Sequence, residues 1–280
     1  MIPPEFDYVA PESLDGALSA LRDGGEDAKV LAGGHSLVPL MKLRLASPTL
    51  LVDLRKVPGL RGVQRENGSW RIGAMTRHVD LQDNADLGVV STAAQQIADQ
   101  QVRNRGTIGG SLAHGDPASD LPAVMLAHEA TVTIVGAGGA RGVAAADLFL
   151  DYLTTAVGEG EILTEIRVPA MDGWGHGYEK FTRRAEDWAM VGVCALVKKA
   201  PDGSCEDVRI GLTHMGSTPL RATAVEDALR GQALDAASIA RAAEQADAGT
   251  QPPGDLNATS DYKRHLARVL CRRALTQAAS

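Results

Sequence analysis

The sequence of 280 residues predicts an α+β fold in three parts: residues 1–56, 57–176 and 177–280. Three observations predict it. The first part has the strand–helix–strand pattern of a βαβ unit, and the second opens with a hairpin signal at Asn67-Gly68. The third has strand-like runs followed by helical patterns to the end. A chain of this length buries roughly 75% of its unfolded surface, so its core needs no disulfide or metal.

In the first part, residues 14–21 place apolar side chains on one helical face, with Ser13 suited as the N-cap. Short buried strands are predicted at 29–32 (KVLA) and 50–54 (LLVDL), with a helix over 37–46 between them. This βαβ unit directs attention to the first strand-to-helix loop, because ligands of such units bind beyond the carboxyl ends of the strands.

The second part continues from its hairpin through a polar, glycine-rich loop into an apolar helix, which Ser119 can cap with Pro122 in its first turn. In the third part, three strands are predicted in an antiparallel sheet backed by helices. They are GYEKFTRR (177–184), WAMVGVCALVKKA (188–200) and CEDVRIGLTHM (205–215).

Composition narrows the function. The net charge of −7 and pI of 5.5 provide no basic field for a polyanion, so nucleic acid is not expected as a partner. Three scattered cysteines lack the spacing of a zinc or iron–sulfur site. No signal segment or membrane-spanning run is evident, which favours the cytoplasm and leaves open membrane association through a partner subunit.

The loop AGGHS, residues 32–36, is the first candidate binding site. A helix start offers unpaired N–H groups and partial positive charge, and glycines allow close backbone approach to an anion. Ser36 is suited to cap the following helix or to donate to a phosphate oxygen. The residues alone leave two interpretations open, a phosphate cradle or a Gly-Gly turn that binds nothing.

A second loop, TIGGS at 107–111, lies in a different part of the chain. Together the two loops are suited to hold one diphosphate from two sides. Asp120 is placed either to accept hydrogen bonds from ribose hydroxyls or to serve the helix start.

Two other motifs are set aside. The segment IVGAGGARG at 134–142 lacks the third glycine of a dinucleotide fingerprint and is predicted to be a hairpin turn. The segment GHSLV at 34–38 lacks the final glycine of a serine-hydrolase elbow. His35 is a candidate base, metal ligand or covalent flavin anchor, although a lone histidine is more often an ordinary loop residue.

Three longer segments carry a family resemblance: LAGGHSLVPLMKLRLASP (31–48), RNRGTIGGSLAHGDPASDLPA (103–123) and GYEKFTRRAEDWAMVGV (177–193). They resemble the signature segments of the FAD-binding medium subunit of molybdenum hydroxylases, the xanthine dehydrogenase family, and most closely that of aerobic carbon monoxide dehydrogenases. The resemblance implies a vanillyl-alcohol-oxidase-like (PCMH-type) FAD-binding domain of two subdomains. A C-terminal domain with a three-stranded antiparallel sheet and helices is implied to follow.

The resemblance also implies site residues. Lys180 is expected near the isoalloxazine, where a cation favours negative charge on the reduced ring, and Asp120 near the ribose or adenosine. Lys29 is expected to approach the cofactor, and no catalytic or metal-binding residue is expected. The two loops are expected to contact the FAD diphosphate through Ala32, Gly33, Gly34, His35, Ser36 and neighbouring Leu37, and through Thr107, Ile108, Gly109, Gly110 and Ser111.

The implied function is electron transfer in an oxidoreductase. A large partner subunit would carry the molybdopterin cofactor and a small one two [2Fe-2S] clusters, in a dimer of heterotrimers. This chain would pass electrons through non-covalent FAD to an external acceptor, with carbon monoxide as one candidate substrate of the complex. The alternatives are a stand-alone flavin oxidase with its own substrate pocket and a non-enzymatic nucleotide-binding subunit.

Overall fold

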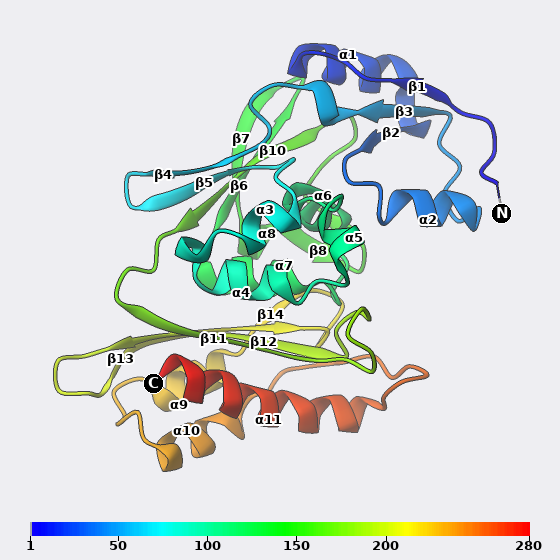
Figure 1. The fold of residues 1–280 in the computed structure, drawn as a ribbon. Coiled ribbons are helices and arrows are strands. Elements are labelled where there is room, and N and C mark those ends of the chain that lie inside the picture. The colour runs from blue at the N-terminus through cyan, green and yellow to red at the C-terminus, as the bar shows by residue number, and fades with distance from the viewer. Residues whose placement is uncertain (1) are drawn as a thin grey trace.

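A three-stranded parallel sheet organises the first part of the computed structural model, which describes residues 2–280 (Figure 1). The order β1-β3-β2 places β3 in the centre, paired in parallel with both neighbours. This confirms the predicted βαβ unit formed by β2, α2 and β3. The elements are β1 (Asp7–Val9), α1 (Leu14–Gly24), β2 (Ala28–Leu31), α2 (Leu37–Lys42) and β3 (Leu50–Asp53), with short 3-10 turns at Gly25–Asp27 and Leu54–Lys56.

Local signals explain where these helices begin and end. The hydroxyl of Ser13 accepts from the backbone N–H of Gly16 at 3.1 Å, as predicted for an N-cap. Helix α2 ends at Lys42, four residues earlier than predicted. It stops because Arg44 adopts a positive φ of 59°, and the N–H of Leu45 then bonds back to Leu40 O at 2.9 Å.

A five-stranded antiparallel sheet forms the second part, in the order β4-β5-β10-β6-β7. The predicted hairpin joins β4 to β5, where Asn67 and Gly68 have φ of 49° and 74° as a type I′ turn requires. The segment set aside as a hairpin turn does join β6 to β7. The strands are β4 (Val63–Glu66), β5 (Ser69–Gly73), β6 (Thr131–Gly136), β7 (Gly139–Ala144) and β10 (Ile162–Pro169), beside the small pair β8 (Phe149–Asp151) and β9 (Thr154–Thr155).

Helices fill the space between this sheet and the third part (Figure 1). Ser119 stands at the N-cap of α7, but its side chain makes no capping bond. All nine residues of α7 are buried, so this helix lies in the interior rather than on the surface. The helices are α3 (His78–Gln82), α4 (Val89–Gln95), α5 (Gln100–Arg103), α6 (Ile108–His114), α7 (Asp120–His128) and α8 (Ala145–Leu148), with a 3-10 turn at Ala85–Leu87.

The third part is an antiparallel sheet of four strands, in the order β11-β12-β13-β14, where three were expected. The additional strand, β14, pairs at the edge of β13. It has only two residues, too few to produce a recognisable sequence pattern. The elements are β11 (Trp174–Phe181), β12 (Val191–Lys199), β13 (Cys205–Thr213), β14 (Leu220–Arg221), α9 (Thr223–Leu229), α10 (Ala236–Ala243) and α11 (Ser260–Ala278).

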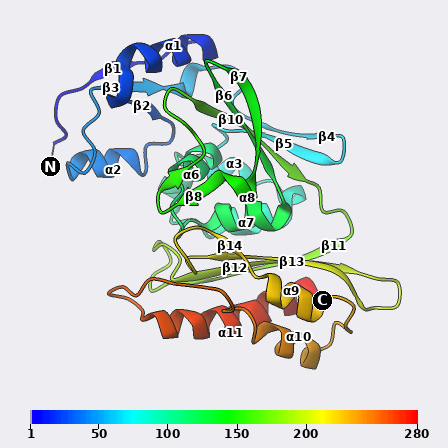
Figure 2. The ribbon, with the colours of Figure 1, turned by 180° about the vertical axis from the view of Figure 1, so that it is seen from behind.

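Both faces of this sheet are covered (Figure 2). Helices α9, α10 and α11 lie on one face, and α4 and α7 lie on the other. Along β12, Val193 and Ala195 join the core beneath the helices, while the alternate residues Cys194 and Leu196 join the core around α7. The sheet is therefore a shared wall between the second and third parts.

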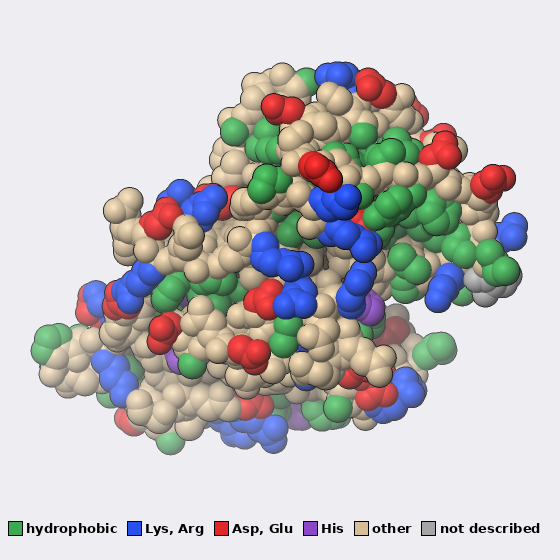
Figure 3. Space-filling view, turned by 45° about the horizontal axis from the view of Figure 1, so that its top comes forward, with side chains coloured by type: hydrophobic (Ala, Val, Ile, Leu, Met, Phe, Trp, Pro, Cys, Tyr) green, Lys and Arg blue, Asp and Glu red, His purple; other side chains and the backbone are tan. Residues whose placement is uncertain are grey.

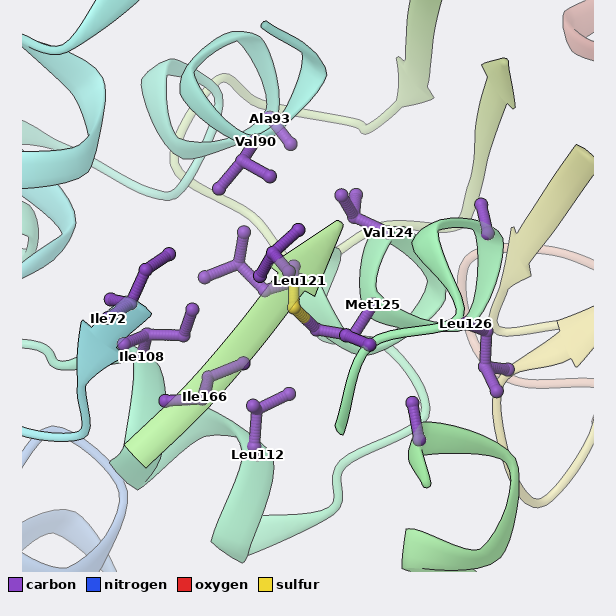
Figure 4. Close-up of a cluster of buried hydrophobic side chains, with 14 of the residues drawn as sticks. Ile72, Val90, Ala93, Ile108, Leu112, Leu121, Val124, Met125, Leu126 and Ile166 are labelled. Atoms are coloured by element: carbon purple, nitrogen blue, oxygen red, sulfur yellow. The ribbon is translucent and has the colours of Figure 1, made fainter. Parts of the chain in front are cut away.

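The largest core lies between α7 and the five-stranded sheet (Figure 4). Ile72 of β5, Ile108 and Leu112 of α6, Leu121 of α7 and Ile166 of β10 gather there, each with no exposed surface. This core fixes the start of α6, and with it the glycine-rich TIGGS loop.

Candidate functional site

A cleft of about 520 Å³ lies where the three parts meet. The loop after β2, the loop and helix around α6, and the loop after β11 all contribute to its lining. The volume falls in the range of small-molecule sites, roughly 300–1,000 Å³. The sequence-predicted loops AGGHS and TIGGS are thus brought to one site, together with Asp120 and Lys180.

The AGGHS loop presents unused backbone donors. Within residues 2–280, the N–H groups of residues 33–37 make no hydrogen bond to the protein. Ser36 is the N-cap residue of α2, yet its hydroxyl makes no capping bond and is also available. Successive free N–H groups beside free hydroxyls form a concave donor set suited to an anion.

Gly33 and Gly34 are required for two different reasons. A Cβ atom on Gly33 would lie 2.5 Å from the carbonyl oxygen of Arg105 and 2.7 Å from Cα of Gly106, so the loop packs directly on backbone of the second part. Gly34 has a φ of 79°, which L side chains rarely adopt. Gly33 therefore allows the first part to pack closely against the second, and Gly34 allows the positive φ that the turn needs.

The TIGGS loop is engaged differently from the predicted cradle. The N–H of Ile108 donates to Thr76 O at 3.0 Å, and that of Gly109 donates to Ala74 O at 2.9 Å. Gly110 N–H donates to the Thr107 hydroxyl at 3.2 Å, and Ser111 N–H donates to Thr107 O at 3.0 Å. These four backbone N–H groups all donate to acceptors within the protein. The Thr107 and Ser111 hydroxyls are therefore the donors that this loop offers to the cleft.

Asp120, Tyr178 and Lys180 form a buried polar cluster between α7 and β11. The Tyr178 hydroxyl donates to Asp120 Oδ1 at 2.5 Å, and Lys180 Nζ donates to Asp120 Oδ2 at 3.0 Å. Lys180 also donates to Gln96 O at 2.9 Å. Burial raises the pKa of the Asp120 carboxyl, while the Lys180 ammonium opposes that rise. One ammonium donor of Lys180 remains for a ligand.

Two of the three histidines that line the cleft have lowered pKa values. Burial lowers the pKa of His35, and the nearby Arg105 guanidinium lowers it further. Burial lowers the pKa of His78 to about 4, with smaller contributions from His35 and Arg103. His78 Nδ1 has no hydrogen-bond partner within residues 2–280. Both rings are therefore neutral at pH 7 and place no cation in the cleft.

Twelve of the fourteen predicted site residues line the cleft. The other two do not: Ile108 lies in the core, and a Cβ atom on Gly109 would lie 2.5 Å from Ala74, so both serve packing. Sequence reasoning missed several lining residues, of which Trp188 is the most notable because its side chain is 56% exposed. The signal available in the sequence was a tryptophan within the signature segment at 177–193. The missed lining residues are Val30, Leu40, His78, Ile97, Ala98, Val102, Gly106, Ala113, His114, Ser119, Glu186, Asp187 and Trp188.

No group of three or more His, Cys, Asp or Glu side chains in residues 2–280 is placed to hold a metal ion. Cys194, Cys205 and Cys271 are free and buried in the core. In the same range, no helix has the length and apolar character of a bilayer span.

Family models cover nearly the whole chain. Residues 4–171 match the FAD binding domain in molybdopterin dehydrogenase, and residues 176–278 match the CO dehydrogenase flavoprotein C-terminal domain. The chain therefore belongs to the FAD-binding medium subunits of molybdenum hydroxylases, a class of oxidoreductase flavoproteins.

Within that class, the chain is 44% identical to the carbon monoxide dehydrogenase medium chain of Hydrogenophaga pseudoflava, over 99% of this chain and 98% of the relative. It is 39% identical to the 6-hydroxypseudooxynicotine dehydrogenase complex subunit alpha of Paenarthrobacter nicotinovorans, over 99% and 96% of the two chains.

Solved structures agree with this placement. Carbon monoxide dehydrogenase from H. pseudoflava superimposes with a TM-score of 0.96 at 44% identity, covering 99% of this chain and 98% of that one. Quinoline 2-oxidoreductase from Pseudomonas putida 86 gives a TM-score of 0.95 at 34% identity, covering 100% and 98%. The vanillyl-alcohol-oxidase-like arrangement expected from the sequence is consistent with both.

Proposed function

We propose that this chain binds FAD non-covalently in the cleft and serves as the electron-exit subunit of a heterotrimeric molybdenum hydroxylase. The single observation that carries the proposal is the run of free backbone N–H groups at residues 33–37, beside the free hydroxyl of Ser36. A diphosphate needs such a donor set, and a turn without a ligand does not.

The residues present fit FAD at each end of the cleft. In this proposal, the AGGHS loop holds the diphosphate, and the hydroxyls of Thr107 and Ser111 face it from the other side. Lys29 lines the same cleft, with its Nζ donating to Glu26 O at 3.1 Å. Trp188 of the third part also lines the cleft and offers an exposed aromatic face for stacking on a planar ring.

The work of the chain is to bind, orient and electrically tune the cofactor. When bound, FAD supplies the ability to exchange electrons singly or in pairs. Lys180 keeps one ammonium donor for the ligand, and Asp120 and Gln96 fix its position from behind. We propose no acid or base among these residues, because the substrate reaction belongs to another subunit.

The proposed partners are a large subunit with the molybdopterin cofactor and a small subunit with two [2Fe-2S] clusters, assembled as a dimer of heterotrimers. Electrons enter this chain from the clusters and leave to an external acceptor. The high identity to carbon monoxide dehydrogenase medium chains favours carbon monoxide as the substrate of the complex. Relatives named for nicotine derivatives are 39% and 34% identical to this chain.

The visible spectrum of the purified chain incubated with FAD tests the proposal, before and after acid precipitation. We expect flavin absorption that passes into the supernatant. Flavin retained in the pellet would indicate a covalent link, with His35 as the candidate anchor, and would favour a stand-alone oxidase. A folded chain that takes up no flavin, alone or within its native complex, would overturn the proposal.

A further inference from the structure

A second pocket of about 390 Å³ lies beside the cleft that is proposed to hold FAD, the flavin cleft, and its charged lining is entirely basic. Five cationic side chains line it: Arg55, Lys56, Arg61, Arg77 and Arg105. Figure 3 shows Lys and Arg side chains gathered along one face of the molecule. In a chain with a net charge of −7, such a concentration of positive charge requires a local explanation.

The charges of this pocket are only partly compensated. Three of the five cations are paired: Arg55 with Asp53 at 2.6 Å, Arg77 with Asp80 at 2.9 Å, and Lys56 with Glu12 at 3.4 Å. Within residues 2–280, Arg61 and Arg105 have no carboxylate within 4.0 Å. The guanidinium of Arg61 makes one weak contact, from Nε to Met75 O at 3.4 Å.

We propose that this basic pocket binds a phosphate-bearing small molecule, at a site separate from the flavin cleft. Guanidinium groups match phosphate oxygens with paired N–H donors, and Asn104 and Thr107 add neutral donors to the lining. The volume lies within the range of small-molecule sites, roughly 300–1,000 Å³. Because the donors line a cavity rather than a flat surface, they are suited to bind a compact anion.

The basic pocket shares a wall with the flavin cleft. Ala32 and Thr107 line both cavities, and Arg105 lies on the backbone segment against which Gly33 packs. A ligand in the basic pocket would therefore border the same two loops that are proposed to hold the diphosphate. This binding site goes beyond the proposed function, which needs one nucleotide only.

Calorimetric titration of the FAD-loaded chain with inorganic pyrophosphate and with ADP tests this site. We expect one equivalent to bind, more weakly at high salt. Arg61→Gln and Arg105→Gln should each weaken binding at least about tenfold, as expected for loss of a charged hydrogen bond. Arg272→Gln changes an exposed arginine on α11 and should leave the affinity unchanged. If ADP binds more tightly than pyrophosphate, the ligand is a nucleotide. If the two probes bind with equal affinity, the ligand is an inorganic phosphate.

The proposal fails if the FAD-loaded chain binds neither probe, or if Arg272→Gln weakens binding as much as the pocket variants. Circular dichroism identifies a variant that does not fold, and the remaining pocket variant then carries the test. Flavin absorbance is measured on the same samples. A chain without flavin would contradict the function proposed above, whereas pyrophosphate binding that Arg61→Gln weakens would still report on the basic pocket.

Discussion

At the scale of single residues, Gly33 has the tightest steric constraint among the glycines that line the cleft. We expect Gly33→Ala to weaken FAD binding at least about tenfold, because its Cβ atom would lie 2.5 Å from Arg105 O and overpacking costs about 1–3 kcal/mol. Gly138→Ala is the matched control, since a Cβ atom there meets nothing within 4 Å. Fluorescence titration with FAD measures both, and equal affinities would contradict the assigned role of Gly33.

The protonation of His128, which lies outside the cleft, makes the free energy of unfolding depend on pH. Burial lowers its pKa to about 4, its Nδ1 contacts Pro169 O at 3.3 Å, and its Nε2 has no partner within residues 2–280. The unfolded chain, with an ordinary pKa near 6.5, binds the proton more readily. Stability is therefore fully present above about pH 6.5 and is lost as pH falls toward 4.

The substitution His128→Gln removes the contribution of this side chain to the pH dependence of stability. Between pH 7 and pH 5 we expect the wild-type chain to lose about 2 kcal/mol more unfolding free energy than the variant. Urea unfolding at the two pH values measures the difference. Identical pH dependence in both proteins would show that the native ring accepts a proton as easily as the unfolded one.

At the scale of elements, β11 and α11 approach until only glycine fits between them. A Cβ atom on Gly177 would lie 2.2 Å from Ala274 O of the helix. We expect Gly177→Ala to lower the free energy of unfolding by about 1–3 kcal/mol, because the helix must move away from the strand. Gly142→Ala in β7 meets its nearest atom at 3.6 Å and should be nearly neutral. Chemical denaturation of both variants measures the contrast.

The elements that the sequence predicted correctly are those with a long local signal, such as the Asn67-Gly68 hairpin and the apolar run of β12. The structure adds β1, whose three residues are all exposed, and β14, which has two residues. Neither is long enough to show an alternating pattern. Each forms by pairing with the edge of another strand, β1 with β3 and β14 with β13. The early end of α2 depended likewise on the backbone conformation of one residue, Arg44.

The candidate site was predictable to a similar extent. Glycine and hydroxyl patterns located both loops, but the hydrogen bonds that occupy the amides of Ile108 and Gly109 come from Thr76 and Ala74. That pairing follows from tertiary packing, which spacing along the chain does not encode. The contact of Asp120 with Lys180 joins residues 60 apart, from a helix and a strand of different parts.

At the scale of the whole molecule, the Asp120–Lys180 pair joins the second part to the third beneath the cleft. The two side chains are 5% and 3% exposed. Removing one partner of a buried pair costs about 3–5 kcal/mol, whereas replacing both with neutral groups is often nearly neutral. We therefore expect Lys180→Met to destabilise the flavin-free chain strongly, and Asp120→Asn combined with Lys180→Met to recover at least half of the loss.

The pH dependence of Lys180→Met separates lost charge pairing from lost packing. Without the ammonium, the buried Asp120 carboxyl titrates at a still higher pKa, so the folded chain holds a proton that the unfolded chain has released. Stability of the variant should then fall as pH rises from 5 to 8, relative to the wild-type chain. Urea unfolding across this range measures the slope. A destabilisation independent of pH, left unchanged by Asp120→Asn, would assign the loss to packing of the lysine stem instead.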